Sequence, residues 1–288
     1  MRIRATVAVA TGALALSALV VPASQAADSH KEHPSLSERG FVWKDRAPQA
    51  NKRALASKAA TLPVITKTVI NGGKPIVLGT TGTKKVTATI TASDDSGIED
   101  AFAILYTGGT GVDDENSYGY APDGEAATCK AASATTSTCT LTFTVSPLDL
   151  WNTDAKTWQV YAAVLGTDLD ITEKDKATSV KFQRASQLTV NAAPEPVKKN
   201  GTVTVTGKLS RANWDTGKYA GYATQSVILQ FRKKTSTAYT NVKGVKTSTT
   251  GTLKTTTKAT VDGYYRWSFV GTATTPAINV AGDYVDVK

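Results

Sequence analysis

Three short acidic segments hold the side chains best suited to bind a metal ion. They are Asp94-Asp95-Ser96-Gly97, Asp113–Asn116 and Asp168-Leu169-Asp170. Ca²⁺ takes about six to eight oxygen ligands from flexible loops, which makes such segments suitable. The candidate ligands are Asp94, Asp95, Asp168 and Asp170. None of the segments has the spacing of an EF-hand loop. Aspartate also commonly closes turns by hydrogen bonding to its own backbone, so a turn role and a calcium site both stay open.

A pair of carboxylates could also hydrolyse a glycosidic bond, provided that burial raises the pKa of one of them. The acidic side chains here lie in polar, turn-like segments, where water keeps them charged. Covalent catalysis by serine or cysteine usually needs a base, most often histidine. The two histidines, His30 and His33, lie in an N-terminal segment without hydrophobic periodicity. The sequence therefore predicts a protein that is not an enzyme and has no cofactor other than the calcium considered above. A carboxylate-based glycan hydrolase is the weakest alternative.

Three aromatic residues, Trp214, Tyr219 and Tyr222, lie with Lys218 in a glycine-rich connection. Exposed aromatic rings beside charged groups would suit a saccharide or a protein partner. The commoner use of aromatic residues in a long loop is to seal the end of the fold. Both interpretations stay open.

Charge is divided unevenly along the chain, whose formal net charge is +9. Residues 61–190 carry 10 basic and 15 acidic side chains, whereas residues 191–288 carry 14 basic and 5 acidic ones. The basic region would attract anionic cell-wall polymers, polysaccharides or nucleic acid without sequence preference, so no specific nucleic acid is predicted. Its densest segment is Arg232-Lys233-Lys234, and such charges also protect sheet edges from aggregation. The two oppositely charged regions could instead dock on each other.

The chain has two cysteines, Cys129 and Cys139. In an oxidising compartment the expected state is a disulfide bond, and two cysteines without a nearby histidine make an incomplete zinc site. We expect a structural disulfide.

The elements that carry these residues are predicted to be strands. The sequence contains 45 threonines, and threonine alternates with apolar residues in segments such as Val86–Ala92 and Thr140–Val145. Alternation with period two indicates strands with one buried face. Trp158 and Trp267 lie on such strands and are expected in cores. Asp262-Gly263 is a typical hairpin turn. Short strands without long helical patterns predict an all-β fold of two tandem immunoglobulin-like β-sandwiches, at residues 61–190 and 191–288, joined at a proline-rich linker.

The N-terminus is typical of an export signal. Arg2 and Arg4 precede the apolar run Ala5–Val21, and Ser24 and Ala26 are small residues at the positions that signal peptidase requires. We predict a signal peptide at residues 1–26 and a disordered leader at residues 27–60. No later segment is apolar and long enough to span a membrane as a helix. The mature chain is therefore expected to be secreted and extracellular.

Two sets of residues resemble domains of a known kind. The second unit runs from Gly201–Gly207 through Trp214–Tyr222 to Asp262–Trp267 and Gly282–Val285. It is similar to the C-terminal Ig-like modules of secreted actinobacterial proteins of uncharacterised function. The first unit, with its two cysteines followed by Thr157–Val160, resembles a partner domain from the same proteins. The resemblance implies fold and export and supplies no function.

Together these patterns favour a secreted, non-enzymatic protein that binds an anionic or saccharide surface of the cell envelope through its basic C-terminal domain. The alternative is an extracellular calcium-dependent structural or adhesive module. The oligomeric state and the identity of the ligand are not predicted.

Overall fold

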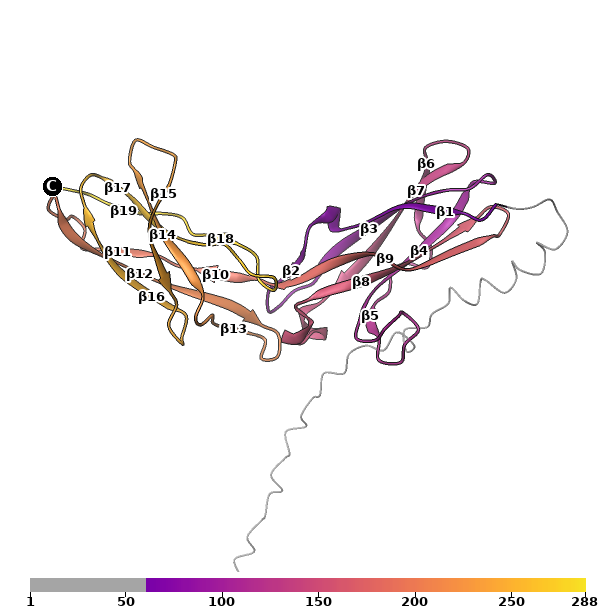
Figure 1. Ribbon diagram of the computed structural model, residues 1–288, viewed down its shortest axis with the longest axis horizontal. Helices are drawn as coiled ribbons and strands as arrows, with labels where there is room; N and C mark the ends of the chain where they lie inside the picture. Colours follow the sequence, from indigo (N-terminus) through magenta and orange to yellow (C-terminus); the bar gives the residue numbers. More distant parts are fainter. Residues whose placement is uncertain (1–60) are drawn as a thin grey trace, which may run out of the picture. The chain divides into compact units, whose positions relative to one another are not determined.

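The computed structural model describes residues 61–288, which form an all-β protein (Figure 1). Four sheets make two β-sandwiches that follow each other along the chain. This confirms the predicted fold of two tandem Ig-like sandwiches. The predicted signal peptide, residues 1–26, and the predicted leader, residues 27–60, lie outside the described residues. Within the described part, no helix has the length and apolar character needed to cross a membrane.

The first sandwich consists of a four-stranded and a five-stranded sheet. The four-stranded sheet has the order β1 (Val64–Ile70), β3 (Lys84–Ser93), β7 (Thr136–Val145) and β6 (Thr128–Ala131). The five-stranded sheet has the order β2 (Ile76–Leu78), β9 (Ile171–Arg184), β8 (Thr157–Gly166), β4 (Ile98–Thr107) and β5 (Tyr118–Tyr120). Strand β2 pairs with β9 in parallel, whereas the other pairs of these sheets are antiparallel. Short 3-10 helices lie in the connections: η3 (Asn71–Gly73), η4 (Pro147–Asp149) and η5 (Asn152–Asp154).

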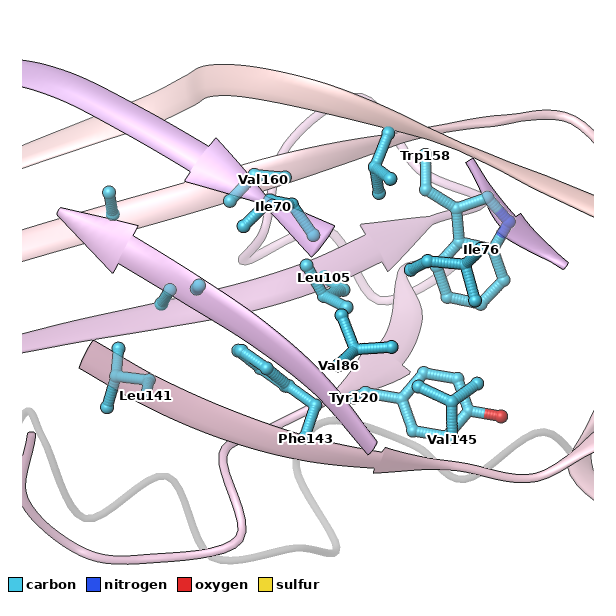
Figure 2. Close-up of a cluster of buried hydrophobic side chains, with 14 of the residues drawn as sticks. Ile70, Ile76, Val86, Leu105, Tyr120, Leu141, Phe143, Val145, Trp158 and Val160 are labelled. Carbon is cyan, nitrogen blue, oxygen red and sulfur yellow. The ribbon is translucent and has the colours of Figure 1, made fainter. Parts of the chain in front are cut away.

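Alternating threonine and apolar residues explain why β3 and β7 pair as they do. Val86 of β3 lies opposite Phe143 of β7, and both side chains are fully buried between the sheets (Figure 2). The threonines between the apolar positions face away from the core, as period two requires. Trp158 of β8 is also buried, as predicted, and its ring stacks on Phe182 with the centroids 4.2 Å apart. The pattern therefore positions one apolar layer between two sheets.

The predicted disulfide bond between Cys129 and Cys139 is confirmed. Cys129 lies in β6 and is directly opposite Cys139 in β7. Because β6 is a short edge strand with mostly exposed side chains, the bond attaches it to a neighbour that is anchored in the core.

The second sandwich consists of two five-stranded sheets. In one, β12 (Gly201–Asn213) pairs with β10 (Ser186–Leu188), β11 (Asn191–Ala193), β13 (Lys218–Gly221) and β16 (Thr252–Ala259). The other contains β15 (Thr240–Lys246), β14 (Ser226–Lys233), β17 (Gly263–Phe269), β18 (Ile278–Asn279) and β19 (Asp283–Val285). Strand pairing in this sandwich begins at Ser186, before the boundary expected at residue 191.

The core of the second sandwich is built partly by Tyr265, Trp267 and Phe269, which alternate along β17. Trp267 is buried as predicted, and its Nε1 donates a hydrogen bond to the carbonyl of Thr206 at 3.0 Å. The prediction that Asp262-Gly263 closes a hairpin is wrong. Strand β16 pairs with β12, and β17 pairs with β14, so the turn carries the chain from one sheet to the other.

Candidate functional site

The outer face of strands β14, β17 and β19 carries adjacent tyrosine and arginine side chains. On β17, Tyr264 and Arg266 alternate with the core residues, and on β14 Gln230 and Arg232 do the same. The register places Arg232 opposite Tyr264, and Tyr264 opposite Tyr284 of β19. A second row pairs Gln230 with Arg266. We call this surface the Tyr–Arg face, which comprises Gln230, Arg232, Tyr239, Tyr264, Arg266 and Tyr284.

The two guanidinium groups of the Tyr–Arg face stack on tyrosine rings. Arg232 Cζ lies 3.8 Å from the ring centroid of Tyr264, and Arg266 Cζ lies 3.7 Å from that of Tyr239. Tyr239 comes from the connection between β14 and β15, and its centroid is also 5.4 Å from Arg232 Cζ. A Cβ at Gly282 would be 2.1 Å from the Tyr239 hydroxyl. Glycine at this position therefore lets Tyr239 close over the face.

Most N–H groups of these arginines have no acceptor among the described residues. Arg232 Nη1 donates to the carbonyl of Ser236 at 2.9 Å, and Arg266 Nε donates to Oε1 of Gln230 at 2.8 Å. Within residues 61–288, neither guanidinium has a carboxylate oxygen within 4 Å. A guanidinium has five N–H donors in a planar fork, which matches carboxylate, phosphate and sulfate oxygens. The stacked rings therefore hold two cations whose donors can serve an external anion.

Lys234 and Asp262 lie at one end of the Tyr–Arg face. Lys234 Nζ is 5.3 Å from the ring centroid of Tyr284 and 3.9 Å from Asp262 Oδ2. A hydrogen bond with Tyr284 raises the pKa of Lys234, and the charge of Asp262 adds to this effect. The backbone N–H of Val287 lowers the pKa of Asp262, with smaller contributions from Tyr284 and Lys234. Lys234 is therefore cationic and Asp262 anionic at neutral pH.

The basic residues singled out from the sequence do not form one cluster. Arg232 belongs to the Tyr–Arg face and Lys234 lies at its end. Lys233 falls on the opposite side of β14, because side chains alternate along a strand. Lys218 is exposed at the start of β13, in the other sheet. The expected Arg232-Lys233-Lys234 patch is therefore divided between two faces.

Of the two interpretations of Trp214, Tyr219 and Tyr222, the structure excludes one exposed binding surface and supports packing. Trp214 is 1% exposed and packs in the core of the first sandwich, where its Nε1 donates to the carbonyl of Gly79 at 2.8 Å. Tyr219 is partly buried against the same core. Tyr222 packs instead against the core of the second sandwich. The connection uses its aromatic residues for packing, which is the alternative that the sequence left open.

Two turns at one end of the first sandwich bring together three of the four candidate metal ligands. Asp94 and Asp95 follow β3, and Asp168 follows β8. One carboxylate oxygen from each lies within 4.8 Å of the others, and we call these three residues the acidic cluster. Asp170 lies beside it and donates its backbone N–H to Asp168 Oδ1 at 3.1 Å. Desolvation and the charges of the acidic cluster raise the pKa of Asp170.

Two other carboxylates of the first sandwich, those of Asp100 and Asp114, hold loops together. Asp100 Oδ1 is the acceptor for the backbone N–H groups of Ala101 and Ala127, both at 2.8 Å. Asp114 accepts hydrogen bonds from Thr110 and Asn116, and these lower its pKa. These carboxylates have turn-stabilising roles. That the protein is not an enzyme stays a prediction.

Tyr239, Tyr264, Arg266 and Tyr284 were not identified from the sequence. For Tyr264 and Arg266 a signal exists, because placing Trp267 in the core puts these two residues on the opposite face of the same strand. For Tyr239 and Tyr284 no local signal exists. Their positions depend on the path of a loop and on the pairing of β19 with β17.

Residues 78–165 match the sequence model of a family of unknown function, DUF5707. No curated protein matches the chain. Solved structures similar to it include dimeric latent PorU from Porphyromonas gingivalis (14% identity, TM-score 0.27, 79% of this chain and 20% of that chain). A second is the Ig1–Ig3 ectodomain of mouse nectin-like molecule 4 (10% identity, TM-score 0.25, 79% of this chain and 65% of that chain). A third is the tandem Ig repeats of Dlar (12% identity, TM-score 0.19, 80% of this chain and 99% of that chain). This chain thus spans 20% of the PorU chain and 65% of the nectin-like chain.

Proposed function

We propose that this chain is a secreted, non-enzymatic protein that binds an anionic polysaccharide of the cell envelope through the Tyr–Arg face. Export is inferred from residues 1–26, and the resemblance to secreted actinobacterial modules supports the same location. The charge of residues 191–288, with 14 basic and 5 acidic side chains, supports an anionic ligand.

One observation carries the proposal: Arg232 and Arg266 are positioned by aromatic rings and not by carboxylates. Stacking restricts the side chains without neutralising them, so less conformational entropy is lost when an anion binds. An ion pair within the protein would instead have to be broken first. The arrangement therefore favours a ligand that supplies carboxylate, phosphate or sulfate groups.

An extended polymer fits this site better than a small anion. The Tyr–Arg face lies across three neighbouring strands, and its two guanidinium groups belong to different strands and different rows. A polysaccharide presents an anionic group on successive sugars and can contact both cations. Its hydroxyls can also pair with tyrosine hydroxyls and with the Gln230 amide.

Affinity electrophoresis and calorimetry with polygalacturonate, a polyuronate, test the proposal, with neutral dextran as the reference polymer. The double variant Arg232→Gln/Arg266→Gln removes both cations of the Tyr–Arg face. The matched control, Lys254→Gln/Lys258→Gln, removes two exposed charges from β16 in the other sheet. Charge-assisted hydrogen bonds contribute about 1.5–3 kcal/mol each, so the face variant, which removes two of them, should lose about 100-fold or more in affinity. The control should retain most of the affinity, and binding should weaken with salt.

Equal losses in the two variants would show that net charge alone holds the polymer and would overturn the assignment to this face. So would equal binding of dextran and polygalacturonate, or no binding of polygalacturonate at low salt. Tighter binding of duplex DNA than of polygalacturonate would refute the polysaccharide as ligand.

A further inference from the structure

We propose that the acidic cluster of Asp94, Asp95 and Asp168 binds one Ca²⁺ ion, which ties the turn after β3 to the turn after β8. This inference is independent of the proposed function, because it concerns the first sandwich and a different ligand.

Hydrogen bonds from backbone N–H groups already join the two turns. Thr167 N–H donates to the carbonyl of Gly97 at 3.1 Å, and Asp168 N–H donates to Ser96 Oγ at 3.3 Å. These bonds bring side chains from distant parts of the sequence to one place. Like charges so close repel each other. Within residues 61–288, no lysine or arginine nitrogen lies within 4 Å of the three carboxylates to offset this repulsion.

A buried oxygen of Asp94 points to a missing partner. Asp94 is 5% exposed, and it belongs to the group whose oxygens converge. Its Oδ2 accepts a hydrogen bond from Ser96 Oγ, whereas its Oδ1 is buried and has no hydrogen-bond donor in the described part of the chain. A buried, unpaired carboxylate oxygen is costly. A cation bound to the Asp94 carboxylate would offset this cost.

Gly166 keeps space open between two of the carboxylates. A Cβ at this position would be 2.6 Å from Asp94 Oδ2 and 2.7 Å from Asp168 Oδ1. Its backbone does not adopt the left-handed conformation for which glycine is needed. Glycine is therefore required here for space. A methyl group would occupy the region on which the carboxylates converge.

The donor set selects calcium. All candidate ligands are oxygens: three carboxylates, the Ser96 hydroxyl and water. Nitrogen- and sulfur-preferring metals are disfavoured by such a set. Two oxygens that each lie about 2.4 Å from one Ca²⁺ ion are at most about 4.8 Å apart. The oxygens of the cluster lie within 4.8 Å of one another, so they can enter one coordination shell. Mg²⁺ demands shorter, near-octahedral geometry and is less well suited to two separate turns.

Thermal unfolding of the chain in CaCl₂, MgCl₂ and EDTA, with calorimetric titration of CaCl₂, tests this inference. Calcium should raise the melting temperature by about 2–4 °C at concentrations several-fold above Kd, with one ion bound per chain. Asp168→Asn and Gly166→Ala should each abolish the shift, one by removing a ligand and one by filling the space. Glu99→Gln is the matched control, because it removes an exposed charge at the same end of the sandwich without touching the cluster.

Circular dichroism of each variant shows that it is folded before the comparison is made. Two variants that act differently keep the test valid if one of them does not fold. A shift in Glu99→Gln like that of the unaltered chain, with none in the cluster variants, supports the site. Equal shifts in all variants, no response at millimolar calcium, or an equal response to MgCl₂ would each overturn it.

Discussion

Replacing Trp214 by alanine should destabilise the first sandwich, although Trp214 follows a strand of the second. The side chain comes from the connection after β12 and belongs to the buried cluster of the first sandwich, where its indole contacts the segment that follows β2. Its backbone N–H donates to Asn152 Oδ1 at 3.0 Å, and its indole N–H donates to Gly79 at 2.8 Å. Trp214 is therefore part of the core of the first sandwich, although it lies in the sequence of the second.

The expected magnitude follows from this burial. Trp214 is 1% exposed, and truncating a buried aromatic side chain to alanine costs about 3–5 kcal/mol. Each 1.4 kcal/mol is about a tenfold change in an opening equilibrium, so amides of the first sandwich should exchange about 100-fold faster or more. Trp214→Phe keeps an aromatic ring of smaller size, loses the indole N–H and leaves the Gly79 carbonyl without this donor. It should cost about 1–2 kcal/mol.

Hydrogen exchange followed by mass spectrometry resolves the effect by sandwich. Peptides from β3 and β8 report on the first core, and peptides from β14 report on the second. Trp267→Phe is the matched control, because its indole N–H donates to Thr206 within the second sandwich. Trp214→Ala should accelerate exchange mainly in β3 and β8, and Trp267→Phe mainly in β14. Unchanged exchange in β3 and β8 of Trp214→Ala would refute the reasoning that this ring belongs to the first core.

Three further predictions concern single features of the two sandwiches. Gly282→Ala should displace Tyr239, because the new Cβ would lie 2.1 Å from its hydroxyl. The variant should bind polygalacturonate more weakly while its far-UV circular dichroism spectrum stays unchanged. Unaltered affinity would exclude Tyr239 from the site. Asp262 accepts a hydrogen bond from the backbone N–H of Val287 at 2.9 Å and has a lowered pKa. Its contribution to stability is therefore complete above the ordinary carboxyl pKa and is lost as the pH falls through the lowered pKa. Exchange at Val287 should therefore rise in acid, and Asp262→Asn should remove that dependence. Reduction of Cys129–Cys139 should cost about 2–3 kcal/mol, measured as a lower melting temperature with dithiothreitol, and a Cys129→Ser/Cys139→Ser variant should show no response to the reductant.

Alternation predicted the strands well where one face is buried and the other is wet. Strands β3 and β7 contain the alternating segments Val86–Ala92 and Thr140–Val145, and they pair throughout their length with apolar residues on one side. A threonine between two apolar residues indicates which face of the strand is exposed to solvent. This inference uses the residues of one strand alone and does not require its partner strand to be known.

The sequence does not show in the same way which strands pair, or which side chains of one sandwich are buried in the core of the other. The Asp262-Gly263 turn has hairpin chemistry, but the dipeptide does not say whether its flanking strands pair with each other or lie in facing sheets. Trp214 has the sequence neighbours of an exposed loop residue, and its burial depends on a core formed by earlier residues. The acidic turns were recognisable by composition. That Asp168 meets Asp94 and Asp95 depends on how β4 and β8 pair.

Strand β17 shows how the proposed binding surface can change without loss of the fold. Tyr265 and Trp267 point into the core, whereas Tyr264 and Arg266 point outward and touch other members of the Tyr–Arg face. A shift of register by one residue would place the Arg266 guanidinium in an apolar core, where an unpaired charge is strongly unfavourable. The core residues thus fix the register, and the register in turn fixes which residues face the solvent. Substitutions at 264 and 266 therefore test binding, whereas substitutions at 265 and 267 test stability.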